Sequence, residues 1–154
     1  MASTIEMISK AATDWSIEVT PTGANKIESF RDCLPPGTTV NVTFLPGTDP
    51  AETIAVAERL HNDGMRPVPH LAARSLRDAD QLDELLTAFT SRCGVDEVLC
   101  IGGGVDKPVG TFDATIQVLE AGLIQKHGIR SVGVAGHPEG SPDISDGEVA
   151  EALA

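Results

Sequence analysis

Five short apolar segments alternate with five segments of helical spacing, and this alternation limits the fold more than any other feature of the chain. The expected strands are residues 14–19, 39–45, 66–71, 97–101 and 131–135. The expected helices are residues 24–33, 50–63, 75–92, 111–126 and a last one beginning at 145. Regular alternation of strands and helices with short loops predicts a parallel sheet with helical crossovers.

Two α/β architectures fit such a sheet. An open, doubly wound sheet of five strands agrees with a length of 154 residues. A complete eight-stranded barrel takes roughly 250 residues, so this chain suffices only for its first part. Five strands of a barrel leave two open sheet edges and an uncovered interior, which favours aggregation. We therefore expect a fragment, a half completed by another chain or a second copy, or a re-closed open sheet.

The composition favours a single globular domain over residues 1–154, with a lead-in helix in residues 1–13. Hydrophobic residues make up 41% of the chain but aromatic residues only 3%, so Ala, Val, Ile and Leu must form the core. A net charge of −12 opposes binding to nucleic acid. The three cysteines have no metal-binding spacing and suit the reduced cytoplasm. Neither a signal peptide nor an apolar run of about 18 residues occurs, so we expect no membrane partner.

Residues capable of binding or catalysis follow the expected strands, and function in both architectures lies at the carboxyl ends of the strands. Glu18, Thr43 and His70 lie near the carboxyl ends of the first three expected strands, and the loops after the fourth and fifth carry Gly102–Gly104 and His137. A charged residue in a buried strand indicates function. His70 fits a core histidine and a ligand-binding one equally well. A triple glycine lets a ligand approach the backbone and offers N–H groups to an anion.

Four segments, taken together, resemble the methylenetetrahydrofolate reductase family over residues 16–144. Residues 16–21 (S-I-E-V-T-P) are similar to the family's S-F-E-F-F-P, and residues 40–44 (V-N-V-T-F) to its V-S-V-T-Y. Residues 69–71 (P-H-L) resemble its P-H-L-T. Residues 134–142 (V-A-G-H-P-E-G-S-P) resemble its V-A-x-Y-P-E-x-H-P, and this match is the most specific.

The resemblance implies the first part of a (βα)8 barrel that binds FMN at its carboxyl rim. The family reduces 5,10-methylenetetrahydrofolate to 5-methyltetrahydrofolate with electrons from NAD(P)H. Glu18 matches the general acid that protonates the folate nitrogen so that an iminium forms, a role that needs a protonated carboxyl group, which burial favours. Thr43 and His70 match residues that contact the flavin. Gly102 and Gly103 match the segment beside the isoalloxazine ring and the phosphate.

The chain departs from the family's pattern at positions that bind ligands. Gly102 replaces an arginine, and Gly104 replaces an aspartate near the flavin that helps to bind folate. His137, a further expected cofactor contact, replaces a tyrosine, and Ser141 replaces a histidine. Because a cation and a carboxylate are lost, three outcomes stay open: FMN or FAD bound differently, folate bound without flavin, or an altered activity.

The expected function is flavin-dependent reduction of methylenetetrahydrofolate in one-carbon metabolism. Glu18, Thr43 and Gly104 would contact the folate, and no metal is expected. The alternative is a non-catalytic half-barrel subunit or regulatory module that binds folate or flavin. A third interpretation is a small open-sheet nucleotide-binding protein. The expected partners are a tetrahydrofolate-type small molecule and a second copy or a completing chain.

Overall fold

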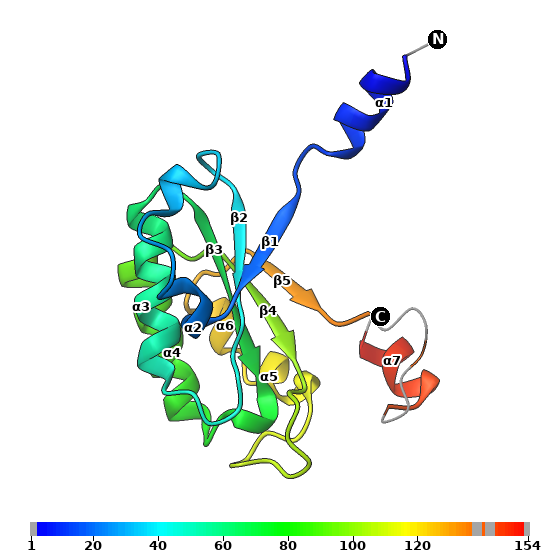
Figure 1. Ribbon diagram of the computed structural model, residues 1–154. Coiled ribbons are helices and arrows are strands. Elements are labelled where there is room, and N and C mark those ends of the chain that lie inside the picture. Colours follow the sequence, from blue (N-terminus) through cyan, green and yellow to red (C-terminus); the bar gives the residue numbers. More distant parts are fainter. Residues whose placement is uncertain (1–2, 137–139, 141–143, 153–154) are drawn as a thin grey trace.

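The computed structural model describes residues 3–136, 140 and 144–152, and its centre is one parallel sheet (Figure 1). The strands are β1 (Ser16–Val19), β2 (Thr39–Val42), β3 (Arg66–Ala72), β4 (Glu97–Ile101) and β5 (Ser131–Val134). The helices are α1 (Thr4–Ala11), α2 (Pro21–Ala24), α3 (Pro50–Asn62), α4 (Ala79–Cys93), α5 (Thr115–Glu120), α6 (Leu123–Lys126) and α7 (Asp146–Ala152), with 3-10 turns η1 (Phe30–Asp32) and η2 (Ala73–Ser75).

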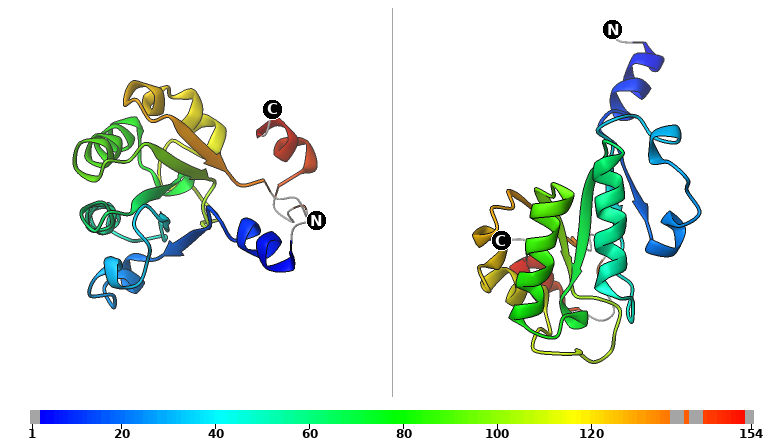
Figure 2. Two further views of the ribbon diagram at one scale, coloured as in Figure 1. Left: turned by 90° about the horizontal axis from the view of Figure 1, so that it is seen from above. Right: turned by 90° about the vertical axis from the view of Figure 1, so that its left-hand side faces the viewer.

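The strands follow one another in the sheet in chain order, β1-β2-β3-β4-β5, and every neighbouring pair is parallel. A doubly wound sheet reverses its strand order and carries helices on both faces. Here the order never reverses, and the strands form an arc with α3, α4, α5 and α6 on its outer side (Figure 2). The predicted α/β fold, a partial barrel of five strands, is therefore confirmed, and the doubly wound alternative is wrong.

The central strand β3 contains two prolines, yet it pairs on both sides. Its first part, residues 66–69, pairs with β2, and its second part, residues 70–72, pairs with β4. The Arg66 N–H donates to the Thr38 carbonyl on the β2 side, so the alternation along a strand turns positions 67 and 69 toward β4. β4 begins to pair only at His70, so no hydrogen bond to β4 is lost because Pro67 and Pro69 have no N–H group.

Side chains on the outer face of the sheet form two hydrophobic clusters under the helices. The first joins Val40 and Val42 of β2 to residues of α2 and α3. The second joins Val98 and Cys100 of β4 to β3, α4, α5 and α6, with Phe89 of α4 fully buried within it. Aliphatic residues dominate both clusters, as the composition predicted.

The expected helix over residues 24–33 is wrong, since the short α2 ends at Ala24 and only the 3-10 turn η1 forms beyond it. Side chains of α3 and its C-cap bind the backbone groups that a continuous helix would pair internally. The Arg59 guanidinium donates to the Ile27 carbonyl at 2.7 Å, and the Phe30 N–H donates to Asp63 Oδ2 at 2.9 Å. This segment is thus held against α3 by tertiary hydrogen bonds that no local pattern encodes.

Capping residues set the bounds of the remaining helices. Asp49 is the N-cap of α3, because its side chain accepts the Ala51 N–H. α4 begins later than expected, since Asp78 caps it after η2. The expected helix over 111–126 is wrong as one unit: Gly122, at φ 69°, separates α5 from α6.

The lead-in helix α1 forms and stands apart from the sheet (Figure 1). Ser3 and Glu6 cap it reciprocally, which satisfies two of the free N–H groups at its start. The side chains of Ile5 and Ile8 stay exposed. No helix in the described part of the chain is both long enough and apolar enough to cross a membrane.

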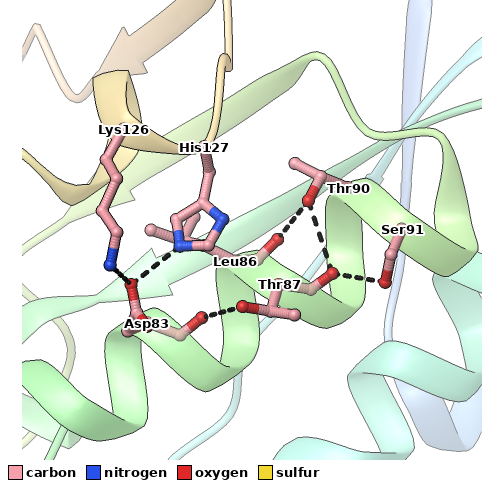
Figure 3. Close-up of polar contacts among 7 residues, drawn as sticks. All are labelled: Asp83, Leu86, Thr87, Thr90, Ser91, Lys126 and His127. Carbon is pink, nitrogen blue, oxygen red and sulfur yellow. Dashed lines mark hydrogen bonds and ion pairs between the residues drawn. The ribbon is translucent and has the colours of Figure 1, made fainter.

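A polar cluster holds α6 against α4 (Figure 3). Asp83 Oδ1 of α4 lies 2.8 Å from Lys126 Nζ and 2.8 Å from His127 Nε2. Thr90 and Ser91, farther along α4, bond instead to carbonyls of their own helix. The hydrogen bonds from Lys126 and His127 hold the pKa of Asp83 below its ordinary value.

We expect Asp83→Asn to lower the melting temperature at pH 7 and to have no effect in strong acid. A carboxyl group with a lowered folded-state pKa stabilises the fold above its unfolded value of about 3.9. That contribution disappears as the pH falls through the folded value. Thermal melts of both proteins from pH 7 to pH 2.5 measure the difference, with Asp106→Asn as a control carboxylate in an exposed loop. A constant difference across this range would contradict the prediction.

Candidate functional site

The carboxyl ends of β1, β2 and β3 bring Glu18, Thr43 and His70 together on the inner face of the sheet. Val40 and Val42 enter the helix-covered cluster, so Asn41 and Thr43 between and after them face the other way. Glu18 is level with Asn41 in the register and shares that face. The sequence predicted that residues following the strands converge at one edge of the sheet, and the structure places these three at that edge.

Glu18 lies between the other two side chains. The Thr43 hydroxyl donates to Glu18 Oε1 at 2.7 Å. Glu18 Oε2 lies 3.9 Å from His70 Nε2, which is an ion-pair distance and too long for a hydrogen bond. One carboxyl oxygen is thus held by a hydrogen bond, and the other is directed at an imidazole.

His70 is a buried histidine without a hydrogen-bond partner. The residue is 5% exposed, and neither ring nitrogen has such a partner among the described residues. Burial lowers the pKa of His70, and the nearby Glu18 charge opposes this shift. The imidazole is therefore neutral at pH 7, with one nitrogen able to donate and the other able to accept.

The expected burial of Glu18 is wrong, since its side chain is 57% exposed. β1 is an edge strand of the sheet, paired only with β2 among the described strands, and Ser16, Ile17 and Glu18 are exposed. The described residues therefore do not supply the desolvation that would favour a protonated carboxyl group. Its role as a general acid stays a prediction.

The triple glycine follows β4, the neighbour of β3, at the same edge of the sheet. Gly103 adopts φ 95°, which favours glycine, and a Cβ there would lie 3.3 Å from the Ala72 Cβ. A Cβ at Gly102 or at Gly104 would meet no atom within 4 Å. Neither packing nor backbone conformation requires glycine at these two positions. The absence of side chains there leaves room beside this edge of the sheet. Within the described residues no hydrogen bond joins this loop to Glu18, Thr43 or His70.

The loop after the glycines crosses the turn between β3 and α4, a feature that the sequence did not predict. The Val109 N–H donates to the Arg74 carbonyl at 2.8 Å, and the Thr111 N–H donates to the Arg77 carbonyl at 2.9 Å. Gly110 lies so close to the turn that a Cβ would be 1.8 Å from the Arg77 carbonyl oxygen. Residues 108–110 (P-V-G) are typical of a turn. They indicate that the chain bends there but not which residues the bend contacts.

Other reactive groups in the described part of the chain are separate from this site. Burial raises the pKa of Cys93 to about 11 and that of Cys100 to about 12, so both remain thiols at neutral pH. A groove of about 450 Å³ lies between α3 and α4, but Asp49 and Gln81 in its lining already accept backbone N–H groups. No cluster of three or more potential metal ligands occurs in residues 3–136, 140 and 144–152.

The predicted cofactor contact His137 lies outside the described residues, as does Ser141, which replaces a histidine of the family pattern. The site that the structure does describe can hold a carboxyl group through one oxygen and can offer a buried neutral imidazole to a ligand. At the end of the neighbouring strand β4, a Cβ at Gly102 or Gly104 would meet no atom within 4 Å. No model of a known protein family matches the sequence.

Proposed function

We propose that this chain carries the acid and part of the cofactor site of a cytoplasmic 5,10-methylenetetrahydrofolate reductase. The observation that supports it best is the Glu18–Thr43–His70 arrangement at the carboxyl ends of three successive parallel strands. A carboxyl group beside a hydroxyl and a neutral imidazole is suited to transferring a proton to a ligand nitrogen.

The residues present fit a flavin ring. His70 offers two buried ring nitrogens without hydrogen-bond partners among the described residues, which a ligand with donors and acceptors would satisfy. The open positions Gly102 and Gly104 leave room for the ligand beside the sheet edge. Thr43, His70, Gly102 and Gly103 would hold FMN or FAD, which when bound supplies hydride transfer from NAD(P)H to folate.

Glu18 would supply the proton. Thr43 donates to Oε1, so Oε1 is the accepting oxygen and the acidic hydrogen belongs on Oε2. Transfer breaks the Oε2–H bond and forms an N–H bond on the folate, whose weakened C–N bond then opens to the iminium. A ligand lying across the inner face would also exclude water from Glu18, and desolvation favours the neutral carboxyl group.

The exposure of Glu18 also supports a second candidate, a non-catalytic module that binds folate or flavin. The Glu18 side chain is 57% exposed, so the described residues do not shield the carboxyl group from water. The glycines at positions 102 and 104 place neither a cation nor a carboxylate beside a cofactor. A protein of this kind would hold the ligand without reducing it.

One set of assays on the purified chain separates the two candidates. The chain is mixed with FMN or FAD, NADH or NADPH, and methylenetetrahydrofolate, and 5-methyltetrahydrofolate is measured by chromatography and mass spectrometry. Calorimetry measures binding of each flavin and of tetrahydrofolate to the same sample. We expect flavin-dependent product. Folate binding without product would support the module, and the absence of both binding and product would overturn both candidates.

A further inference from the structure

We infer that His70 is a positioning residue for Glu18, holding carboxyl oxygen Oε2 as Thr43 holds oxygen Oε1. The two atoms that would meet, His70 Nε2 and Glu18 Oε2, lie 3.9 Å apart. The inference rests on the proposed function only in that Glu18 is the acid of the reaction. The contact between the two side chains does not depend on that function.

The ring nitrogens of His70 lack hydrogen-bond partners among the described residues, and few neighbouring groups can supply one. A buried polar atom without a hydrogen bond destabilises the fold, so each unpaired ring nitrogen favours any rearrangement that satisfies it. β4 places the apolar Leu99 level with His70, and the hydroxyl of Thr43 already donates to Glu18. Glu18 is the titratable group whose charge acts on the pKa of His70.

Glu18 is the side chain that can move. His70 is enclosed, whereas the Glu18 side chain is more than half exposed and is held by the hydrogen bond from Thr43, so the glutamate is the side chain that can close the 3.9 Å separation. The carboxyl group would then be held at both oxygens. This fixes the direction in which Oε2 presents its proton.

A neutral imidazole can hold either form of the carboxyl group. With the hydrogen on Nε2, it donates to a lone pair of Oε2, whether the carboxyl group is ionised or carries its hydrogen on that oxygen. His70 can thus keep Glu18 in place before and after proton transfer and leave the acidic hydrogen for the ligand. In this tautomer Nδ1 remains free to accept a hydrogen bond from a cofactor.

Nitrogen-15 NMR of the histidine rings tests the contact without any enzyme assay. The chain has four histidines, and the signals of His70 are those missing in His70→Gln. At pH 7 we expect a neutral His70 ring with hydrogen on Nε2. Because Glu18 raises the pKa of His70, Glu18→Gln should lower the titration midpoint. The control Glu28→Gln, an exposed carboxylate, should not. Equal midpoints and tautomers in the wild type and Glu18→Gln would overturn the inference.

A pair of variants tests the positioning role in turnover. The side-chain amide of Gln reaches the place of Nε2, and that of Asn reaches only the place of Nδ1. We expect His70→Gln to keep a kcat about tenfold above that of His70→Asn, the cost of one hydrogen bond, at similar KM. Equal kcat in two variants with the same melting temperature would overturn the inference. An NMR effect without product formation by the wild type would instead support the contact and contradict the reductase.

Discussion

Glu18→Gln is expected to lower turnover of methylenetetrahydrofolate by about 10²- to 10⁴-fold, the usual contribution of a general acid. Glutamine keeps the shape of the side chain and an oxygen that accepts the Thr43 hydroxyl, but it has no acidic hydrogen. Binding of flavin and folate should therefore stay close to wild type. Steady-state kinetics and calorimetry on the same preparations measure the two effects separately.

The control for this variant is Glu28→Gln, which removes an exposed carboxylate away from the inner face. Its turnover should equal that of the wild type. Full turnover by Glu18→Gln would show that another group delivers the proton. A loss of folate binding equal to the loss of turnover would show that Glu18 binds the substrate rather than protonating it.

The second large effect is expected at Gly110, where Gly110→Ala should destabilise the fold by about 3 kcal/mol or more, the upper part of the range for overpacking. The added Cβ would lie 1.8 Å from the Arg77 carbonyl oxygen. The group that this Cβ would meet is the backbone of Arg77, which cannot rotate away as a flexible side chain does. The loop must therefore lift from the turn, and the hydrogen bonds at Val109 and Thr111 are lost with it.

Chemical denaturation measures this loss, and Gly104→Ala is the matched control in the same loop. A Cβ at Gly104 would meet no atom within 4 Å, so its free energy of unfolding should stay within about 0.5 kcal/mol of wild type, as for ordinary surface changes. If Gly110→Ala were as stable as Gly104→Ala, the loop would not lie against the turn as described.

The strands could be predicted well because their signals are local. Runs of apolar and β-branched residues between prolines and glycines marked all five, and the bounds of Glu97–Ile101 agree with the structure. The helices were harder where tertiary contacts compete with helical spacing. Arg59 and Asp63 bind the backbone near Ile27 and Phe30, and nothing in residues 24–33 indicates such partners.

The sequence predicted where on the fold the candidate site lies, but not the exposure or the contacts of its residues. Parallel strands align their carboxyl ends, and this rule alone brought Glu18, Thr43 and His70 together. The exposure of Glu18 could not be predicted, because it depends on what lies across the inner face beside an edge strand. The contact of Gly110 with Arg77 could not be predicted either. The path of a loop brings these two residues together, and no repeating sequence pattern indicates that path.

The division of β3 between its two neighbours has a consequence for how the fold opens. The first part of β3 pairs with β2 and the second part with β4, whereas α3 contributes side chains to both hydrophobic clusters. Such boundaries commonly separate cooperative units that unfold at different free energies. Glu18 and Thr43 belong to the unit on the β2 side, whereas the part of β3 that carries His70 pairs with β4. Opening of the smaller unit would therefore separate the acid from its imidazole while the rest of the sheet stays folded.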